Sequence, residues 1–121
     1  METHNAVAAL AALAQDNRLE MFRLLVRAGP QGMAAGDVAE KLGLAPNTLT
    51  FHFDRLRFAG LITVRRNGRS MIYAAQYAAM NDLVSFLTEN CCQGAQECLP
   101  AAVCKPKGVS RHEAVSRARG R

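Results

Sequence analysis

The chain has 121 residues, of which 50% are hydrophobic and 21% are charged, and its formal net charge is +5. This composition is typical of one globular domain and excludes collagen-like, low-complexity and disordered chains. The apolar run from Ala6 to Ala14 is too short to span a bilayer and has no basic leader, so we expect a cytoplasmic protein without a membrane partner.

The basic charge is unevenly distributed. Residues 105–121 contain six basic residues and one acidic residue, so this tail alone carries +5 and the rest of the chain is neutral. Residues 45–70 contain five arginines and one aspartate, a local charge of +4. Because a DNA duplex attracts local basic surface, this segment is a candidate nucleic-acid interface. The tail has few apolar residues and is predicted to be disordered, with a modest, salt-sensitive attraction for phosphates.

Two helices are expected before residue 30. Apolar residues at helical spacing predict a first helix that ends near Gln15. Asn17 and Glu20 fit a capping box at the start of a second helix, with Asp16 as the alternative cap, and the glycine-proline pair at 29–30 ends that helix. The apolar residues of the first helix are Val7, Leu10 and Leu13.

Two further helices follow across a tight turn. A short helix is predicted from about Ala35 to Leu42, with Gly43 as its C-terminal cap. The next helix is predicted from about Pro46 or Asn47 to Ala59. Two helices joined by so short a turn form a helix-turn-helix.

The period of the sequence changes after Gly60. Two runs rich in β-forming residues, LITVRR and RSMIYA, flank Asn67-Gly68 and predict a hairpin closed by a type I′ turn. A last helix is predicted from about Tyr77 to Asn90. The fold class is therefore mainly α with a small β-hairpin, in the order of four helices, two strands and one helix, which is a winged helix-turn-helix.

The helix after Pro46 presents two different faces to its surroundings. One apolar face is predicted to lie on the core, and the opposite face is predicted to be exposed, with Asn47 and Thr50 near its N-terminal edge. In helix-turn-helix proteins this end enters the major groove, where apolar contact with a thymine methyl would suit Phe51. An amphipathic helix in a plain helical bundle is the alternative. The core residues are Leu49, Phe53 and Leu56, and the exposed ones are Thr48, Phe51, His52 and Arg55.

The hairpin carries arginines on both sides of its tip. Arg65, Arg66 and Arg69 flank Asn67-Gly68, where an exposed hairpin can reach phosphates or the minor groove. Arginines on an edge hairpin also serve solubility and protection against edge pairing. Their combination with a basic preceding helix favours DNA binding.

Three segments of the sequence are distinctive: NRLEMFRLL at 17–25, DVAEKLGLAPNTLTFHFDRLRFAGLITV at 37–64 and NGRSMIYA at 67–74. They resemble the arsenical-resistance repressor (ArsR/SmtB) family of dimeric winged-helix metalloregulators. The resemblance implies a homodimer formed by the first and last helices, which bind double-stranded operator DNA together. It also implies recognition-helix contacts from Asn47, Thr48, Thr50 and His52, and a wing contact from Arg69.

All four cysteines lie between residues 91 and 104, and in a reducing cytosol such a cluster favours metal binding or redox sensing over structural disulfides. Residues 33–42 contain no cysteine and residues 54–110 contain no histidine, so two metal sites known in the family are absent. The remaining pattern resembles arsenite sensors whose thiolates follow the last helix. The resemblance implies As(III), or Sb(III), held by Cys91, Cys92 and Cys98.

The sequence therefore predicts three parts: a winged helix-turn-helix at 1–90, a cysteine-rich effector loop at 91–104 and a basic tail at 105–121. The predicted function is a repressor that releases operator DNA on binding As(III). With Cys104 as a fourth ligand the cluster suits Zn or Cd, and vicinal thiols can instead be oxidised. A thiol-based arsenate reductase is the least supported alternative, because no phosphate-cradling loop is present, and we expect no enzyme and no organic cofactor.

Overall fold

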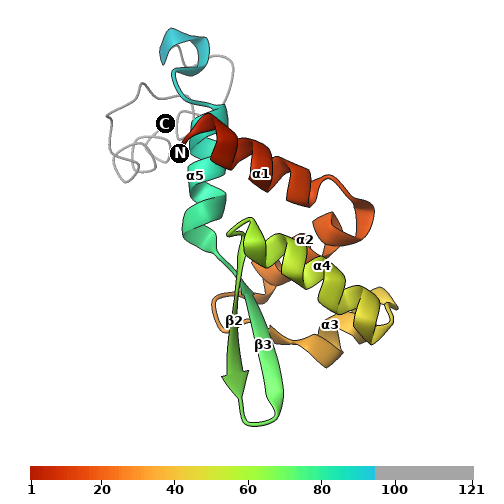
Figure 1. Cartoon of the computed structure of the whole chain (residues 1–121). Helices are drawn as coiled ribbons and strands as arrows, with labels where there is room; N and C mark the ends of the chain where they lie inside the picture. Colours follow the sequence, from red (N-terminus) through yellow and green to blue (C-terminus); the bar gives the residue numbers. More distant parts are fainter. Residues whose placement is uncertain (95–121) are drawn as a thin grey trace. The chain divides into compact units, whose positions relative to one another are not determined.

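A computed structural model describes residues 1–94 of the chain, which belong to two compact units, Met1–Asn81 and the unit that starts at Asp82. Within this range the predicted order of helices and strands is confirmed (Figure 1). Two short elements are added, a strand before the third helix and a 3₁₀ helix after the last helix. None of the helices in this range combines the length and apolar character that a membrane crossing needs. The elements are α1 (Thr3–Leu13), α2 (Asp16–Ala28), β1 (Met33–Ala34), α3 (Ala35–Leu42), α4 (Pro46–Phe58), β2 (Ile62–Asn67), β3 (Ser70–Ala75), α5 (Tyr77–Leu87) and the 3₁₀ helix η1 (Cys91–Gly94).

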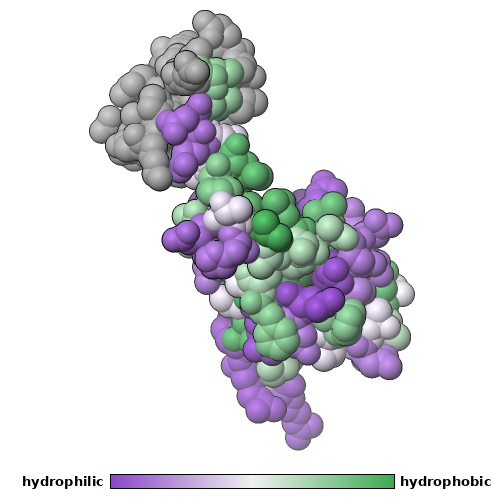
Figure 2. All heavy atoms as spheres, turned by 45° about the horizontal axis from the view of Figure 1, so that its top comes forward, coloured by the Kyte–Doolittle hydropathy of each residue, from purple (hydrophilic) through white to green (hydrophobic). Residues whose placement is uncertain are grey.

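Helix α1 packs on the core through its alanines. Val7 and Leu10 are 58% and 42% exposed. Figure 2 shows that apolar residues reach the surface on the face of the molecule that it draws. Alanine on the inner face lets α1 approach α2 and α4 closely, while the larger apolar side chains remain on the surface. The buried residues of α1 are Ala6, Ala9 and Ala12.

The start of α2 differs from the predicted capping box. The N-cap is Gln15, whose side-chain oxygen accepts a hydrogen bond of 3.0 Å from the backbone N–H of Arg18. The prediction of Asn17 or Asp16 as the cap is therefore wrong. Gln15 is the residue that has extended backbone angles and so places its side chain over the free N–H groups of the first turn.

The interior of the first unit joins the helices to the sheet. Met21 and Leu25 of α2 are fully buried, as is Leu56 of α4. The ring of Phe53 in α4 stacks on that of Tyr73 in β3, with centroids 3.6 Å apart and an angle of 10° between the planes. Burying one side chain of this size contributes about 1.5–3 kcal/mol, so these residues supply much of the stability that fixes α4 against the hairpin.

The sheet has three strands in the order β1-β3-β2, and both pairs are antiparallel. The sequence predicts only β2 and β3, because a two-residue strand such as β1 shows no alternation. β1 pairs Met33 with Tyr73 and makes β3 the central strand. The hydroxyl of Tyr77, just after β3, donates a 2.8 Å hydrogen bond to the carbonyl of Val26 in α2.

The turn at the hairpin tip lies one residue further along than predicted. Asn67 pairs with Ser70, so Asn67 is the last residue of β2 and the two loop residues are Gly68 and Arg69. Gly68 has a φ of 63°, whereas Arg69 has no positive φ. A positive φ at the first loop position alone is typical of a type II′ turn, so the predicted type I′ turn is wrong.

Helix α5 ends at Leu87, three residues before the predicted end at Asn90. Asn90 and Cys92 have φ values of 57° and 51°, which are left-handed conformations that an α-helix excludes. The chain therefore leaves the helical path before it reaches the two adjacent cysteines.

We predict that Gly32→Ala destabilises the protein by about 1–3 kcal/mol. Gly32 has a φ of +79°, and a methyl group on it would overlap the carbonyl oxygen of Tyr73. Gly36→Ala is the control, because Gly36 lies in α3 with no atom within 4 Å of the added methyl. Urea denaturation followed by circular dichroism should show a lower midpoint for the first variant and an equal or higher midpoint for the second. Equal midpoints for the two variants would contradict this prediction.

Candidate nucleic-acid interface

The two faces of α4 are arranged largely as the sequence predicts. Leu49, Phe53 and Leu56 are 4%, 1% and 0% exposed, which confirms the inward face. Asn47, Thr48, Thr50, Phe51 and Arg55 are exposed. Since the inward residues fix the rotation of the helix, the polar N-terminal half of α4 is held toward solvent.

The N-terminal end of α4 keeps most of its polar groups available. The N-cap, Ala45, has no side chain that can accept a hydrogen bond, and Pro46 begins the helix. The hydroxyl of Thr50 donates to the carbonyl of Pro46 at 3.0 Å, whereas the side chains of Asn47 and Thr48 make no hydrogen bond within residues 1–94. Free helix N–H groups and unpaired polar side chains suit contact with phosphates and base edges.

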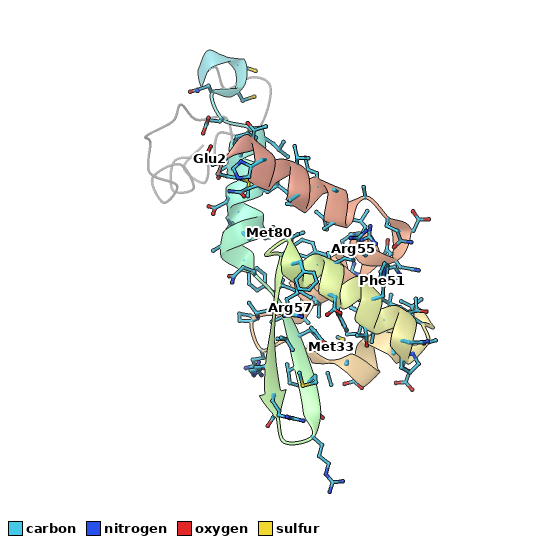
Figure 3. All side chains as sticks on the ribbon, in the orientation of Figure 1. Glu2, Met33, Phe51, Arg55, Arg57 and Met80 are labelled. Atoms are coloured by element: carbon cyan, nitrogen blue, oxygen red, sulfur yellow. The ribbon has the colours of Figure 1, made fainter. Side chains whose placement is uncertain are left out.

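Phe51 and Arg55 form a pair on the exposed side of α4 (Figure 3). The guanidinium carbon of Arg55 lies 5.5 Å from the centre of the Phe51 ring, which is 55% exposed. A cation over an aromatic face at an exposed site is worth about 0.5–1 kcal/mol and limits the motion of both side chains. The pair therefore presents an apolar ring and a positive charge together.

His52 does not lie on the outward face. It is 6% exposed, and its Nδ1 atom is buried without a hydrogen-bond partner within residues 1–94. Burial lowers the pKa of His52 below its ordinary value of 6.5, and the positive charge of Arg18 lowers it further. The expectation that His52 shares a surface with Thr48 and Arg55 is therefore wrong, and a neutral, inward imidazole is the form that the structure favours.

The wing carries its arginines on exposed positions. Arg65 donates a 2.9 Å hydrogen bond to the carbonyl of Gln31, which ties β2 to the loop before β1. Arg66 is exposed near the tip and Arg69 occupies the tip itself. The sequence interpretation missed the role of Gln31, because a backbone carbonyl acceptor leaves no residue-type signal.

The positive charge of this surface is not neutralised by an ion pair within residues 1–94. The ion pairs found in residues 1–94 join Arg23 to Glu20 and Arg57 to Asp54, and both are exposed. The arginines predicted to contact DNA therefore have no carboxylate partner in this part of the chain. These arginines are Arg55, Arg65, Arg66 and Arg69.

Two of the predicted metal ligands fall within the described residues. The Sγ atoms of Cys91 and Cys92 lie 3.6 Å apart in η1, and Cys92 is disulfide-bonded. Residues 1–94 contain no group of three or more His, Cys, Asp or Glu side chains that could hold a metal ion. Cys98 and Cys104 lie outside the described residues, so the predicted trio of ligands stays a prediction.

Known proteins resemble this chain in sequence and in fold. A helix-turn-helix domain family, HTH_20, matches residues 13–65. The nodulation protein NolR of Rhizobium meliloti is 30% identical over 80 residues, which are 66% of this chain and 63% of NolR. The NolR structure from Sinorhizobium fredii is 30% identical with a TM-score of 0.57, and the match covers 69% of this chain and 81% of that one. An ArsR-like regulator from Rhodococcus sp. RHA1 is 25% identical with a TM-score of 0.61, over 69% of this chain and 76% of that one.

The exposed recognition helix, the basic wing and the matched domain define a winged helix-turn-helix DNA-binding transcriptional regulator. Within that class, the chain belongs to the ArsR family.

We predict that His52 makes the stability of the protein pH-dependent. Because its folded pKa is below its unfolded value of 6.5, the unfolded state binds more protons as the pH falls through that value, and the free energy of unfolding decreases. Urea denaturation at pH 7.5 and at pH 5.5 measures how much the free energy of unfolding decreases between the two pH values. The decrease should be smaller for His52→Gln than for the wild type. His4→Gln, which changes an exposed histidine, should lose as much as the wild type. The prediction fails if the loss is the same in all three proteins.

Proposed function

We propose that the chain is a homodimeric repressor that binds operator DNA and releases it when As(III) or Sb(III) binds to Cys91, Cys92 and Cys98. In this proposal the N-terminal half of α4 enters the major groove and the wing reaches the flanking backbone or minor groove. The DNA-binding part of the proposal rests on the exposed residues of α4 and the wing, whose arginines have no carboxylate partner within residues 1–94. The observation that supports the effector half is the short distance between the sulfur atoms of Cys91 and Cys92 just beyond α5, and ion binding would require the disulfide of Cys92 to be reduced first.

The α4 contacts divide into two kinds. Asn47 and Thr48 have free polar side chains that suit base edges, and the exposed ring of Phe51 suits a thymine methyl group. In this proposal Arg55, Arg66 and Arg69 contact phosphates, which adds affinity without sequence preference. Because His52 is buried, it acts in this proposal as a packing residue of α4.

Exposed apolar residues support a homodimer. Val7 and Leu10 lie on the surface of α1, and Val84 and Leu87 lie on the surface of α5. A second copy that covers these residues would remove them from water. The M. bovis protein Mb0332, 21% identical with a TM-score of 0.59, is described as a homodimeric winged helix-turn-helix domain. Two copies would present two α4 helices about 34–36 Å apart, one turn of DNA.

The spacing of the sulfur atoms of Cys91 and Cys92 suits a soft ion once Cys92 is reduced. Two sulfurs bound tetrahedrally at about 2.3 Å from one ion lie about 3.8 Å apart, close to the 3.6 Å between the Sγ atoms of Cys91 and Cys92. The left-handed backbone at Asn90 and Cys92 permits this approach, since adjacent side chains of an α-helix diverge by about 100°. Soft thiolates select soft ions, so arsenic, antimony, zinc and cadmium are the relevant class.

Coupling to DNA requires little energy. The cysteines follow α5 directly in the chain, and α5 is a proposed dimer element. Ligation that fixes the segment after α5 would therefore favour one arrangement of the dimer over another. A coupling free energy of about 1–3 kcal/mol changes DNA affinity by about 5- to 150-fold, which suffices to release a promoter.

Thiol oxidation is a second candidate signal, and a specific observation favours it. Cys92 is disulfide-bonded, so the cysteine segment can adopt an oxidised form, whereas ion binding requires reduced Cys92. Ion binding and thiol oxidation can be distinguished by experiment. Arsenite would act on reduced protein in the absence of an oxidant, whereas peroxide would act in the absence of a metal or metalloid ion. Zinc or cadmium with Cys104 as a fourth ligand remains the third alternative.

We predict that Arg69→Ala weakens binding to a DNA duplex and lowers the dependence of the affinity on salt. Loss of one phosphate contact per subunit, or two per dimer, should reduce the magnitude of the slope of log K against log salt by about 1.8. Fluorescence anisotropy with a labelled promoter duplex at several salt concentrations measures both quantities. Arg23→Ala is the matched control, since Arg23 is an exposed arginine of α2 that is paired with Glu20. Equal slopes for both variants would remove Arg69 from the interface.

We predict that arsenite lowers the DNA affinity of the reduced wild-type protein by about 5- to 150-fold and leaves that of Cys92→Ser unchanged. The reductant should be a phosphine, because a dithiol would itself bind arsenic. Cys104→Ser is the control and should respond as the wild type does. A Cys92→Ser protein that still releases DNA would rule out the proposed site, and a wild type that responds only to peroxide would establish the oxidation alternative.

A further inference from the structure

A cavity of about 260 Å³ lies in the first unit between α1, the start of α2 and the C-terminal part of α4. Its apolar wall consists of the ring of Phe58 and of alanines. Its remaining wall is formed by Arg18 and Arg55. We propose that this cavity binds a small organic carboxylate whose apolar body is one ring or a short branched chain. The alanines are Ala8, Ala11, Ala12 and Ala59.

The charge of the cavity is complementary to an anion. The ion pairs within residues 1–94 involve other arginines, so neither Arg18 nor Arg55 has a carboxylate partner there. The Nε of Arg18 donates a 2.6 Å hydrogen bond to the carbonyl of Ala12, which fixes the guanidinium and leaves its two terminal nitrogens for a ligand. A planar guanidinium pairs with a carboxylate through two parallel hydrogen bonds, which makes this the best-matched ligand group.

A buried histidine near Arg18 is exposed to the charge of this arginine. His52 is more than nine-tenths buried, its Nδ1 has no hydrogen-bond partner within residues 1–94, and Arg18 is near enough to lower its pKa. An anion at Arg18 would oppose the positive potential that acts on this imidazole. The positive charge of Arg18 therefore favours a carboxylate over a neutral ligand at this site.

The size and lining of the cavity restrict the ligand further. Pockets for drug-sized molecules measure about 300–1,000 Å³, so a cavity of about 260 Å³ takes a smaller one. The apolar wall consists of four methyl groups and an aromatic ring, and an inorganic anion has no apolar part that could pack against it. A purely apolar ligand would make no hydrogen bond with the two guanidiniums. A single-ring or short branched carboxylate uses both walls, and it would give the regulator a ligand site independent of its cysteines.

The test is an NMR titration of the ¹⁵N-labelled full chain, without DNA and without metal. Sodium benzoate is the probe, and benzamide is the neutral control with the same ring and nearly the same shape. Benzoate should cause saturable shifts at the amides of the lining residues, with an affinity at least about tenfold higher than that of benzamide. Equal affinities for the two probes would overturn the proposal. So would the absence of shifts at these residues, which is the result expected if a second copy of the chain covers the cavity.

Two variants locate the binding within the cavity. Ala11→Leu fills the cavity from an exposed position of α1 and should abolish saturable benzoate binding, whereas Ala14→Leu, exposed but outside the lining, should retain it. Arg18→Met keeps the length of the side chain and should reduce benzoate affinity to that of benzamide. Thermal melts establish that each variant is folded. A folded Ala11→Leu protein that binds benzoate as tightly as the wild type would overturn the proposal.

Discussion

The stack of Phe53 on Tyr73 joins the recognition helix to the wing. Phe53 is on the inward face of α4, and Tyr73 is on β3, the central strand of the sheet. Because the rings lie nearly parallel at 3.6 Å and Phe53 is 1% exposed, α4 cannot rotate about its axis without breaking this contact. The exposed residues of α4 and the arginines of β2 and the turn are thereby held on one rigid frame, as the reading of one DNA site requires.

The sequence predicts the inward face of α4 well, because three large apolar residues at i, i+4 and i+7 leave one way to orient a helix. His52 shows the limit of that reasoning. It lies four residues after Thr48 and three before Arg55, which are exposed, and also three after Leu49 and four before Leu56, which are buried. Periodicity places such a residue at the boundary between the two faces, and the packing of neighbouring helices decides its side.

The other differences also arise from tertiary contacts. Strand register, set by the pairing of Ile62 with Ala75 and onward, leaves Gly68 and Arg69 in the turn, although Asn67-Gly68 is the stronger local signal. Gln15 caps α2 although the preferred cap types, Asn and Asp, follow it directly, because only Gln15 has the extended backbone of a cap. The sulfur atoms of Cys91 and Cys92, adjacent in the sequence, do lie close together in η1, but the third predicted ligand, Cys98, lies beyond the described residues.

The central claim is that two winged subunits bind duplex DNA through α4 and the wing, and that the cysteines after α5 control the DNA affinity. Hydroxyl-radical footprinting of the promoter, with and without arsenite on reduced protein, tests it most directly. The account predicts two protected regions one helical turn, or about 10 base pairs, apart, both lost on adding arsenite. A single protected region, or a footprint that arsenite leaves intact, would contradict it.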